Sequence, residues 1–261
     1  MTTTTASAGP VAAPPRDPSA PPPRDPSAPP PRDPTAPPLP GPVAPPYERI
    51  RAGREFGANV RSTVDVLWVL YDRVLRVTPE TVDDPGRDRF LLSKGHAVAG
   101  YYAVLAAKGF VPADWLDDQG GPDSRLGDHP DRLLVPGVEI GSGSLGHGLG
   151  LGVGTALGLR AQGLLTPRVH VLLGDAELDE GSNHEAIAYA GATGLGSLTA
   201  IVIDNGSATH GWPGGAAARF TVNGWTATTV DGHDHEALHT ALTGHDNHRP
   251  HVVVAVVDQG E

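Results

Sequence analysis

The sequence contains no cysteine and has little that would attract nucleic acid or lipid. Without a thiol, disulfides, zinc–thiolate centres and cysteine nucleophiles are excluded. The 19 basic and 30 acidic side chains give a formal net charge of −11, which argues against a general affinity for nucleic acid or anionic membranes. No apolar run approaches the roughly 18 residues that span a bilayer, and no signal peptide is visible. We therefore expect a cytoplasmic protein that binds neither nucleic acid nor membrane.

Proline, by contrast, is abundant, and most of it lies in residues 1–46. An eight-residue repeat, PPRDPSAP, places Arg16, Arg24 and Arg32 at identical spacing. Such a segment buries too little apolar surface to offset its ordering entropy, so a disordered tail with polyproline character is expected. A solvated spacer is favoured over a docking site for a proline-recognising partner. Residues 47–261 are expected to form one globular domain with a core of its own.

Hydrophobic periodicity predicts alternating helices and strands in that domain. The expected helices are 47–77, 97–108, 148–162, 184–192 and 235–242. The expected strands are 90–92, 168–173, 198–203, 227–230 and 252–257. The apolar runs of these strands are too continuous for a sheet with one solvated face, which predicts a doubly wound, mostly parallel α/β sheet with helices on both faces. Ligands in such sheets bind beyond the carboxyl ends of the strands.

Polar residues follow two of the expected strands at that edge. Asp175 comes directly after strand 168–173, and Asn205 follows strand 198–203. One βαβ crossover would bring the two to neighbouring strand ends, where the main-chain carbonyl of Ser207 is suitably placed as a third ligand. This set of hard oxygens leaves positions for phosphate oxygens and water, as Mg²⁺ or Ca²⁺ prefers. Either turn alone would be a weak signal, but the two together are harder to dismiss.

Four sequence blocks, in order, resemble the transketolase family over about residues 47–257. Residues 88–96 read DRFLLSKGH, and residues 129–131 and 136–139 read HPD and PGVE. Residues 143–148 read GSLGHG, and residues 174–186 read GDAELDEGSNHEA, followed by DNG at 204–206. The last pair of motifs is similar to the family's thiamine-diphosphate signature. The resemblance implies a thiamine-diphosphate-binding fold and a two-carbon ketol transfer between sugar-phosphate-like substrates.

The resemblance also implies roles for individual residues. The implied metal ligands are Asp175, Asn205 and the carbonyl of Ser207. The implied cofactor contacts are His96, Gly143, Ser144, Leu145, Gly174, Asp175, Ala176, Glu177 and Asn205. The implied catalytic residues are His96, His129, Glu180 and Glu185. His96 would lie near the diphosphate and the reacting carbon, and His129 near the substrate hydroxyls. Glu180 and Glu185 resemble the buried acids that link the two active sites of a dimer, whereas Asp65 is expected to be structural.

A partner chain is expected as well. The cofactor's aminopyrimidine acts as a base when a glutamate hydrogen-bonds to it, and in the family that glutamate belongs to a second domain. Here the sequence stops at Glu261, directly after the last expected strand. The chain therefore resembles the N-terminal subunit of a split transketolase, and we expect a heterotetramer or similar assembly with a C-terminal, pyrimidine-binding subunit.

The sequence departs from the family pattern at several positions. Phe56 stands where the family has a histidine that contacts the donor substrate, and Asn59 replaces a glycine in the same turn. The glycine-rich tail that often closes the diphosphate site does not follow. Because a phenyl ring cannot hydrogen-bond, these changes point to a changed substrate or a weakened enzyme. His147 also replaces a glutamine, and Ala176 replaces a glycine, but the Ala176 amide could still donate to the diphosphate because only the backbone is used.

Other interpretations stay open at this stage. Gly141-x-Gly143-x-x-Gly146 fits a dinucleotide fingerprint, but a lone match is weak and no acidic residue follows at the right distance. A non-catalytic scaffold and a thiamine enzyme with another carboligation or decarboxylation reaction are further alternatives. His235 and His239, one helical turn apart, suggest zinc, but no third ligand has metal-site spacing and Asp234 fits a helix N-cap.

Overall fold

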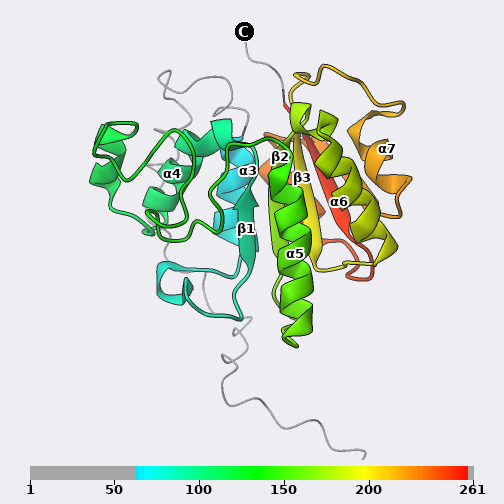
Figure 1. Ribbon diagram of the computed structural model, residues 1–261, viewed down its shortest axis with the longest axis horizontal. Coiled ribbons are helices and arrows are strands. Elements are labelled where there is room, and N and C mark those ends of the chain that lie inside the picture. Colours follow the sequence, from blue (N-terminus) through cyan, green and yellow to red (C-terminus); the bar gives the residue numbers. More distant parts are fainter. Residues whose placement is uncertain (1–62, 258–261) are drawn as a thin grey trace, which may run out of the picture. The chain divides into compact units, whose positions relative to one another are not determined.

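A five-stranded parallel sheet lies at the centre of the structure, a computed structural model that describes residues 63–257 (Figure 1). Its strands are β1 (Arg89–Leu92), β2 (Val169–Gly174), β3 (Leu198–Asp204), β4 (Thr226–Asp231) and β5 (His251–Val256). They are ordered β1-β2-β3-β5-β4, and each neighbouring pair is parallel. All carboxyl ends therefore lie at one edge of the sheet. The predicted doubly wound parallel sheet is confirmed.

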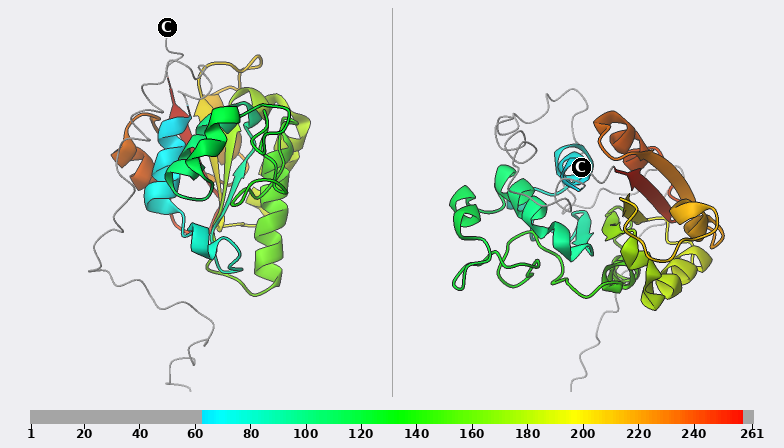
Figure 2. Two further views of the ribbon diagram at one scale, coloured as in Figure 1. Left: turned by 90° about the vertical axis from the view of Figure 1, so that its left-hand side faces the viewer. Right: turned by 90° about the horizontal axis from the view of Figure 1, so that it is seen from above.

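Helices cover both faces of the sheet. On one face lie α5 (His147–Ala161), α6 (Gly181–Ala192) and α7 (Gly215–Thr221), and on the other α3 (Val64–Val69), α4 (Val98–Ala107) and α8 (His235–Thr243). Figure 2 shows the strands between these two layers. Alternate residues of each strand enter the two cores, as Val171 and Leu172 do. Within residues 63–257, no helix combines the length and apolar character needed to cross a bilayer.

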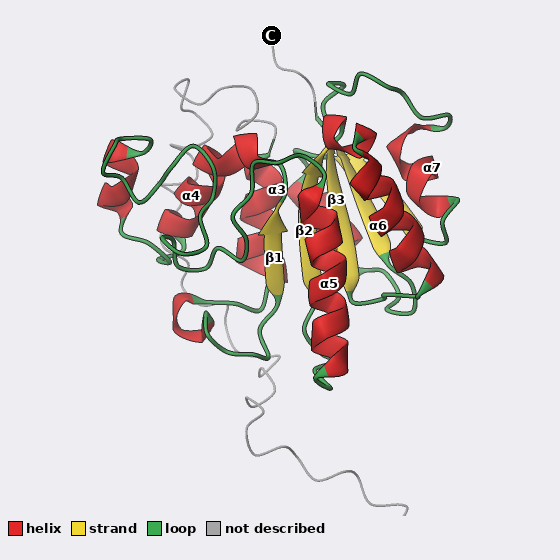
Figure 3. Ribbon diagram, viewed as in Figure 1, coloured by secondary structure: helices red, strands yellow, loops and turns green. Residues whose placement is uncertain are grey.

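The longest connection, residues 119–146, joins the α4 region to α5 and is drawn as loop in Figure 3. It ends in the glycine-rich segment that precedes α5. No strand lies directly before this segment, so the context required by a dinucleotide fingerprint is missing.

The first helix ends earlier than predicted. After α3 the chain makes one π-helical turn, Leu70–Val74, and Leu75 is extended, whereas the sequence predicted a helix to Val77. The reason is a long-range contact: the amide of Arg76 donates to Asp88 Oδ2 at 2.9 Å instead of to a helical carbonyl. Residues 47–62 of the predicted helix, and the predicted tail 1–46, lie outside the described residues.

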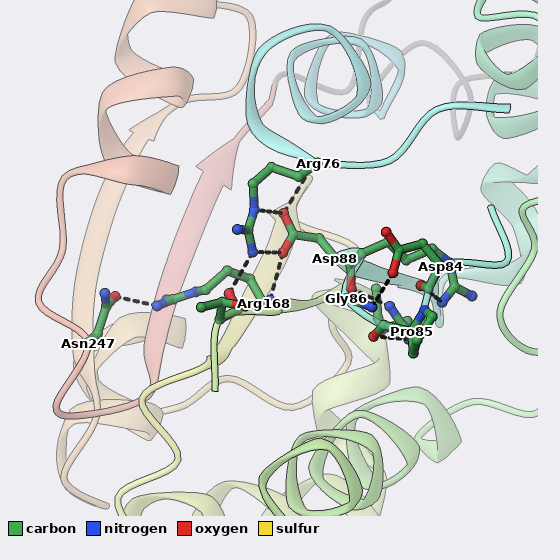
Figure 4. Close-up of polar contacts among 10 residues, drawn as sticks. Arg76, Asp84, Pro85, Gly86, Asp88, Arg168 and Asn247 are labelled. Carbon is green, nitrogen blue, oxygen red and sulfur yellow. Dashed lines mark hydrogen bonds and ion pairs between the residues drawn. The ribbon is translucent and has the colours of Figure 1, made fainter. Parts of the chain in front are cut away.

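Asp88 holds three segments together at the amino edge of the sheet (Figure 4). Its carboxylate accepts from the amide, Nε and Nη2 of Arg76, and from the amide of Arg168 at 2.7 Å. Asp88 is 2% exposed. Because Asp88 precedes β1 and Arg168 precedes β2, this one side chain fixes the starts of both strands against the end of the first helix.

A row of buried polar residues lies at the same amino edge, at the starts of β2, β3 and β5. His170, Thr199 and His251 are neighbours in register on β2, β3 and β5, and all three are buried. The His251 ring stacks on His245 with centroids 4.4 Å apart, and its Nδ1 hydrogen-bonds to Thr226 Oγ1 at 2.7 Å. Burial lowers the pKa of both His170 and His251 to about 4. These histidines are therefore neutral at physiological pH.

The pH dependence of unfolding tests this neutral state. Burial lowers the pKa of His170 to about 4, whereas in an unfolded chain the value is near 6.5. Between these pH values the unfolded state binds a proton that the folded state does not, so the unfolding free energy falls as the pH drops. From pH 7 to pH 5, His170 alone should cost about 2 kcal/mol of stability.

In urea titrations, a His170→Gln variant should therefore lose less stability between pH 7 and pH 5 than the unsubstituted protein. The comparison uses the change with pH in each protein, so a general destabilisation by the substitution cancels. Equal losses in the two proteins would contradict the neutral, buried histidine.

Candidate functional site

The loop after β3 folds over the acidic residue that follows β2. Asp175 is 4% exposed, and its amide donates to the carbonyl of Ile203 at 3.0 Å. Its carboxylate accepts from the Ser207 amide at 2.6 Å, the Ser207 hydroxyl at 2.5 Å and the Ala208 amide at 3.0 Å. Two residues earlier in that loop, Asn205 is half-buried. The two strand ends thus converge, as the crossover argument predicted.

This arrangement suits a hard divalent cation. Asp175 supplies a carboxylate, and the loop contributes the Asn205 amide and the Ser207 main chain, which are oxygen donors of the kind that Mg²⁺ or Ca²⁺ prefers. Ser207 now donates its hydroxyl and amide to Asp175, so a bound cation would replace or reorder part of these contacts. In the described part of the chain, no cluster of three or more His, Cys, Asp or Glu side chains could hold a metal. A site here would depend on a single carboxylate together with neutral and ligand oxygens.

Glu177 connects the three segments around this edge. The side chain is 1% exposed; its Oε1 accepts from Ser93 Oγ at 2.6 Å and from the Gly146 amide at 3.1 Å, and its Oε2 accepts from the Gly174 amide at 3.0 Å. The carboxylate is therefore engaged with donors from the protein. The predicted contact between Glu177 and the cofactor stays a prediction, and the hydrogen bonds show that this side chain positions the surrounding loops.

The glycine-rich loop depends on glycine at two positions. Gly143 and Gly146 have φ of 141° and 84°, where an L side chain is strained. A Cβ on Gly143 would lie 2.9 Å from the ring of His129, and one on Gly146 would lie 2.5 Å from the hydroxyl of Ser182. The tip of the loop, Ser144 and Leu145, remains exposed. Its backbone is thus open to a ligand.

Two histidines flank this loop. The rings of His96 and His129 have centroids 5.9 Å apart, and both side chains are exposed. His129 also approaches Gly143, since its Cδ2 would contact a Cβ there. The structure therefore brings His96, His129 and Gly143 together, whereas their contacts with cofactor and substrate stay a prediction.

A buried cation at this edge was missed from the sequence. Lys94 is 8% exposed, its side chain lies against Gly174, and its Nζ has no hydrogen-bond partner among the described residues. Burial lowers the pKa of Lys94, while the nearby charges of Asp175 and Glu177 act in the opposite direction. The SKGH motif contained the residue, but nothing in the sequence showed that its ammonium would be buried beside Gly174.

Two predicted catalytic acids are exposed on this chain, namely Glu180 and Glu185. Glu180 lies just before α6 and Glu185 on its outer side, where contact with another chain would bury them. Their predicted role, which joins two active sites across a dimer, stays a prediction. The amide of Ala176, which was expected to donate to the diphosphate, here donates to Asp175 Oδ1 at 2.9 Å.

The C-terminal histidines have a structural explanation. His233 Nδ1 and His235 Nε2 lie 2.8 Å and 2.7 Å from the two carboxylate oxygens of buried Asp65. Asp234 caps α8 by accepting from the amides of Glu236 and Ala237, as predicted. These contacts join α3 to the start of α8 and give no support to zinc binding.

Comparison with known proteins identifies the family. Residues 52–257 match the family described as "Transketolase, thiamine diphosphate binding domain". The chain belongs to the transketolase family. The cofactor predicted for this transketolase domain, thiamine diphosphate, is confirmed by that match, whereas the divalent metal stays a prediction. Family membership leaves the dinucleotide interpretation without support.

Two curated relatives differ in what their names say. "Ferredoxin fas2" of Rhodococcoides fascians is 54% identical over 209 residues, which is 80% of this chain and 69% of the relative. Iron–sulfur clusters are held by cysteine thiolates, and this chain has no cysteine, so that name does not describe it. A protein of Actinobacillus succinogenes, named as one of the subunits of an apulose-4-phosphate transketolase, is 36% identical over 216 residues, or 80% of this chain and 78% of the relative.

Solved transketolases share the fold. A Pichia stipitis transketolase crystallised with fructose 6-phosphate superposes with a TM-score of 0.67 at 28% identity over 76% of this chain. The match covers 36% of that longer enzyme. The fold of this domain is therefore established, while the activity of a whole transketolase involves parts that this chain does not align with.

Substituting two nearby glycines tests the packing of the site. A Cβ on Gly148 would lie 2.2 Å from the Ser93 Cβ, whereas one on Gly150 would meet nothing within 4 Å. Gly148→Ala should lower the unfolding free energy by about 1–3 kcal/mol, because the start of α5 and Ser93 must move apart, which disturbs the Ser93–Glu177 hydrogen bond. Gly150→Ala, the matched control in α5, should stabilise by up to about 1 kcal/mol through helix propensity. Chemical unfolding measures both, and equal effects would contradict the close contact.

Proposed function

We propose that this chain is the diphosphate- and metal-binding subunit of a two-subunit transketolase, which transfers a two-carbon ketol unit between sugar-phosphate-like substrates in the cytoplasm. The observation that carries the proposal is the convergence of Asp175 with the Asn205–Ser207 loop beside the glycine-rich segment. That convergence supplies oxygen ligands and open backbone at one edge of a parallel sheet, where such folds bind ligands.

The residues present fit the diphosphate group of the cofactor. Lys94 provides a buried ammonium whose Nζ has no hydrogen-bond partner among the described residues, and a diphosphate oxygen would satisfy it. Asp175, Asn205 and the Ser207 carbonyl would hold an Mg²⁺ or Ca²⁺ ion. Gly143, Ser144 and Leu145 would contact the ring part of the cofactor, and Gly174, Ala176 and His96 the diphosphate. Lys94 is our addition to the set inferred from sequence.

The chain's own residues would bind and orient the reactants. Thiamine diphosphate, when bound, supplies a nucleophilic carbon for carbonyl chemistry. His96 and His129 lie beside the loop that would contact the cofactor. Their exposed imidazoles could form hydrogen bonds with substrate hydroxyls and exchange protons with them. Glu177 would keep the segments of Ser93, Gly146 and Gly174 in place through its hydrogen bonds to them.

A partner chain is supported by the surface around the site. Leu145, Leu151 and Tyr189 are 42%, 47% and 50% exposed on the glycine-rich loop, α5 and α6. On α5, Gly150, Gly154 and Gly158 have open space where a Cβ would stand, so another helix could approach closely. A second chain that packs on this region would cover these apolar side chains. Glu180 and Glu185 lie along the same region, and a second chain would bury them. The partner we propose is the C-terminal, pyrimidine-binding subunit, in a heterotetramer or similar assembly.

The substrate is proposed only as a class. The relative whose name refers to an apulose-4-phosphate transketolase suggests a phosphorylated ketose. Phe56, which replaces a donor-contacting histidine of the family, lies outside the described residues. Loss of that polar group favours a donor other than the usual sugar phosphates.

Binding of thiamine diphosphate tests the diphosphate site directly. In the presence of Mg²⁺ and the partner subunit, Lys94→Met should weaken cofactor binding about 10- to 100-fold, because a charge-assisted interaction contributes roughly 1.5–3 kcal/mol. With Asp175→Asn, Mg²⁺ should no longer strengthen the binding of thiamine diphosphate. Lys108→Met is the matched control, because Lys108 pairs with Asp72 and lies over Trp68. Fluorescence titration measures the affinities, and equal affinities of the two lysine variants would count against the assignment.

The need for a partner is tested by reconstitution. The chain alone should show no ketol transfer, and mixing it with a transketolase-like C-terminal subunit should restore the reaction and yield a complex that elutes as one species. Full activity of the isolated chain would refute the two-subunit proposal. Magnesium-dependent cofactor binding without any transfer would favour the scaffold alternative or a different thiamine-dependent reaction.

A further inference from the structure

A cavity lies at the amino edge of the sheet, opposite the proposed cofactor site. Its volume is about 210 Å³, and its polar lining comes from Arg76, Asp88, Arg168, His170, His245 and Asn247. Arg76 follows the first helix, Asp88 precedes β1, Arg168 precedes β2, and His245 and Asn247 lie in the α8–β5 loop (Figure 4). None of these residues has a role in the proposed transketolase reaction.

The cavity has an excess of positive charge. Asp88 already accepts four N–H groups from Arg76 and the Arg168 amide. The guanidinium of Arg168 donates to Asn247 Oδ1 and approaches His245 Nε2 at 3.4 Å, both of which are neutral groups. Burial lowers the pKa of Arg168, and the charge of Asp88 acts in the opposite direction. Asp88 pairs with the Arg76 guanidinium but bonds only to the main-chain amide of Arg168. An anion beside the Arg168 guanidinium would therefore offset the cost of its burial.

His170 also lines this cavity, and its ring carries a buried nitrogen without a partner in the described part of the chain. Its side chain is 2% exposed, and Nδ1 has no hydrogen-bond partner among residues 63–257. The ring is neutral, because burial lowers its pKa to about 4.

Size and chemistry limit what the cavity can hold. At about 210 Å³ it is smaller than the roughly 300–1,000 Å³ of pockets for drug-sized ligands, but larger than a single water needs. The adjacent guanidiniums disfavour a cation, and no group of described His, Cys, Asp or Glu residues here could hold a metal. Planar guanidinium groups match the oxygens of phosphate-like anions.

We infer that this cavity binds a small tetrahedral oxyanion, either free phosphate or the phosphoryl group of a small metabolite, with the Arg168 guanidinium as its main donor. The anion would join the α8–β5 loop to the start of β2. Because the cavity lies at the opposite edge from Asp175, this inference does not depend on the proposed function.

Calorimetric titration of the full-length chain with inorganic phosphate, at constant ionic strength set with chloride, tests the inference. We expect one binding event that persists when magnesium and thiamine diphosphate are saturating. Arg168→Gln should weaken it at least tenfold, Arg168→Lys less, and Arg160→Gln, which removes an exposed arginine from α5, should leave it unchanged. A parallel titration with glycerol phosphate distinguishes the two sources: tighter binding of the ester points to a metabolite, and binding of phosphate alone to the free ion.

Three results would overturn the inference. The first is that neither phosphate compound binds. The second is that thiamine diphosphate displaces phosphate, which would place the phosphate at the cofactor site. The third is that Arg168→Gln and Arg160→Gln weaken binding equally, which would indicate a general charge effect. The displacement measurement uses the unsubstituted chain, so it decides the matter even if an Arg168 variant fails to fold.

Discussion

The carboxylate of Glu177 is the contact on which the candidate site depends. It accepts from the Ser93 hydroxyl and from the amides of Gly146 and Gly174, which belong to the segments after β1, before α5 and at the end of β2. A buried carboxylate is costly unless charge-assisted hydrogen bonds replace its hydration, and three such bonds do so here. Since each donor comes from a different segment, the negative charge can be accommodated only when all three are in place. The shape of the ligand edge is thus set by a residue that need not touch the ligand.

The two edges of the sheet are polar in different ways. At the carboxyl edge, acidic Asp175 and Glu177 lie beside the lone buried ammonium of Lys94 and the exposed glycine-rich loop. At the amino edge, two arginines and neutral buried histidines surround one fully engaged aspartate. Between them, the strands are apolar on both faces, so neither cluster contacts the other. A parallel sheet allows this separation, because every strand begins at one edge and ends at the other.

The sequence predicted what depends on local pattern and missed what depends on distant partners. The strands were placed within one or two residues, because continuous apolar runs such as 198–203 can be satisfied only inside a two-sided sheet. The first helix was predicted too long, because its end is decided by Asp88, twelve residues after Arg76. The bonds of Glu177 to Ser93 and Gly146 could not be predicted, because its motif contains no sign of either residue. Lys94 was overlooked because lysine is rarely buried, and its burial becomes visible only when β1 is placed beside β2.

The exposure of the proposed catalytic groups indicates why a second surface is required. His96 and His129 are open to solvent, Leu145 is 42% exposed, and the acids Glu180 and Glu185 lie on the outside of the chain. Carbonyl chemistry at a carbon nucleophile needs a site from which water is excluded, because electrostatic interactions are weak and side reactions fast in bulk solvent. The described residues provide candidate oxygen ligands for a metal, a buried ammonium and the glycine-rich loop, and they leave His96 and His129 exposed. The open glycines of α5 and the apolar side chains beside them are where a covering chain could approach most closely, and that contact would bury the acids at the same time.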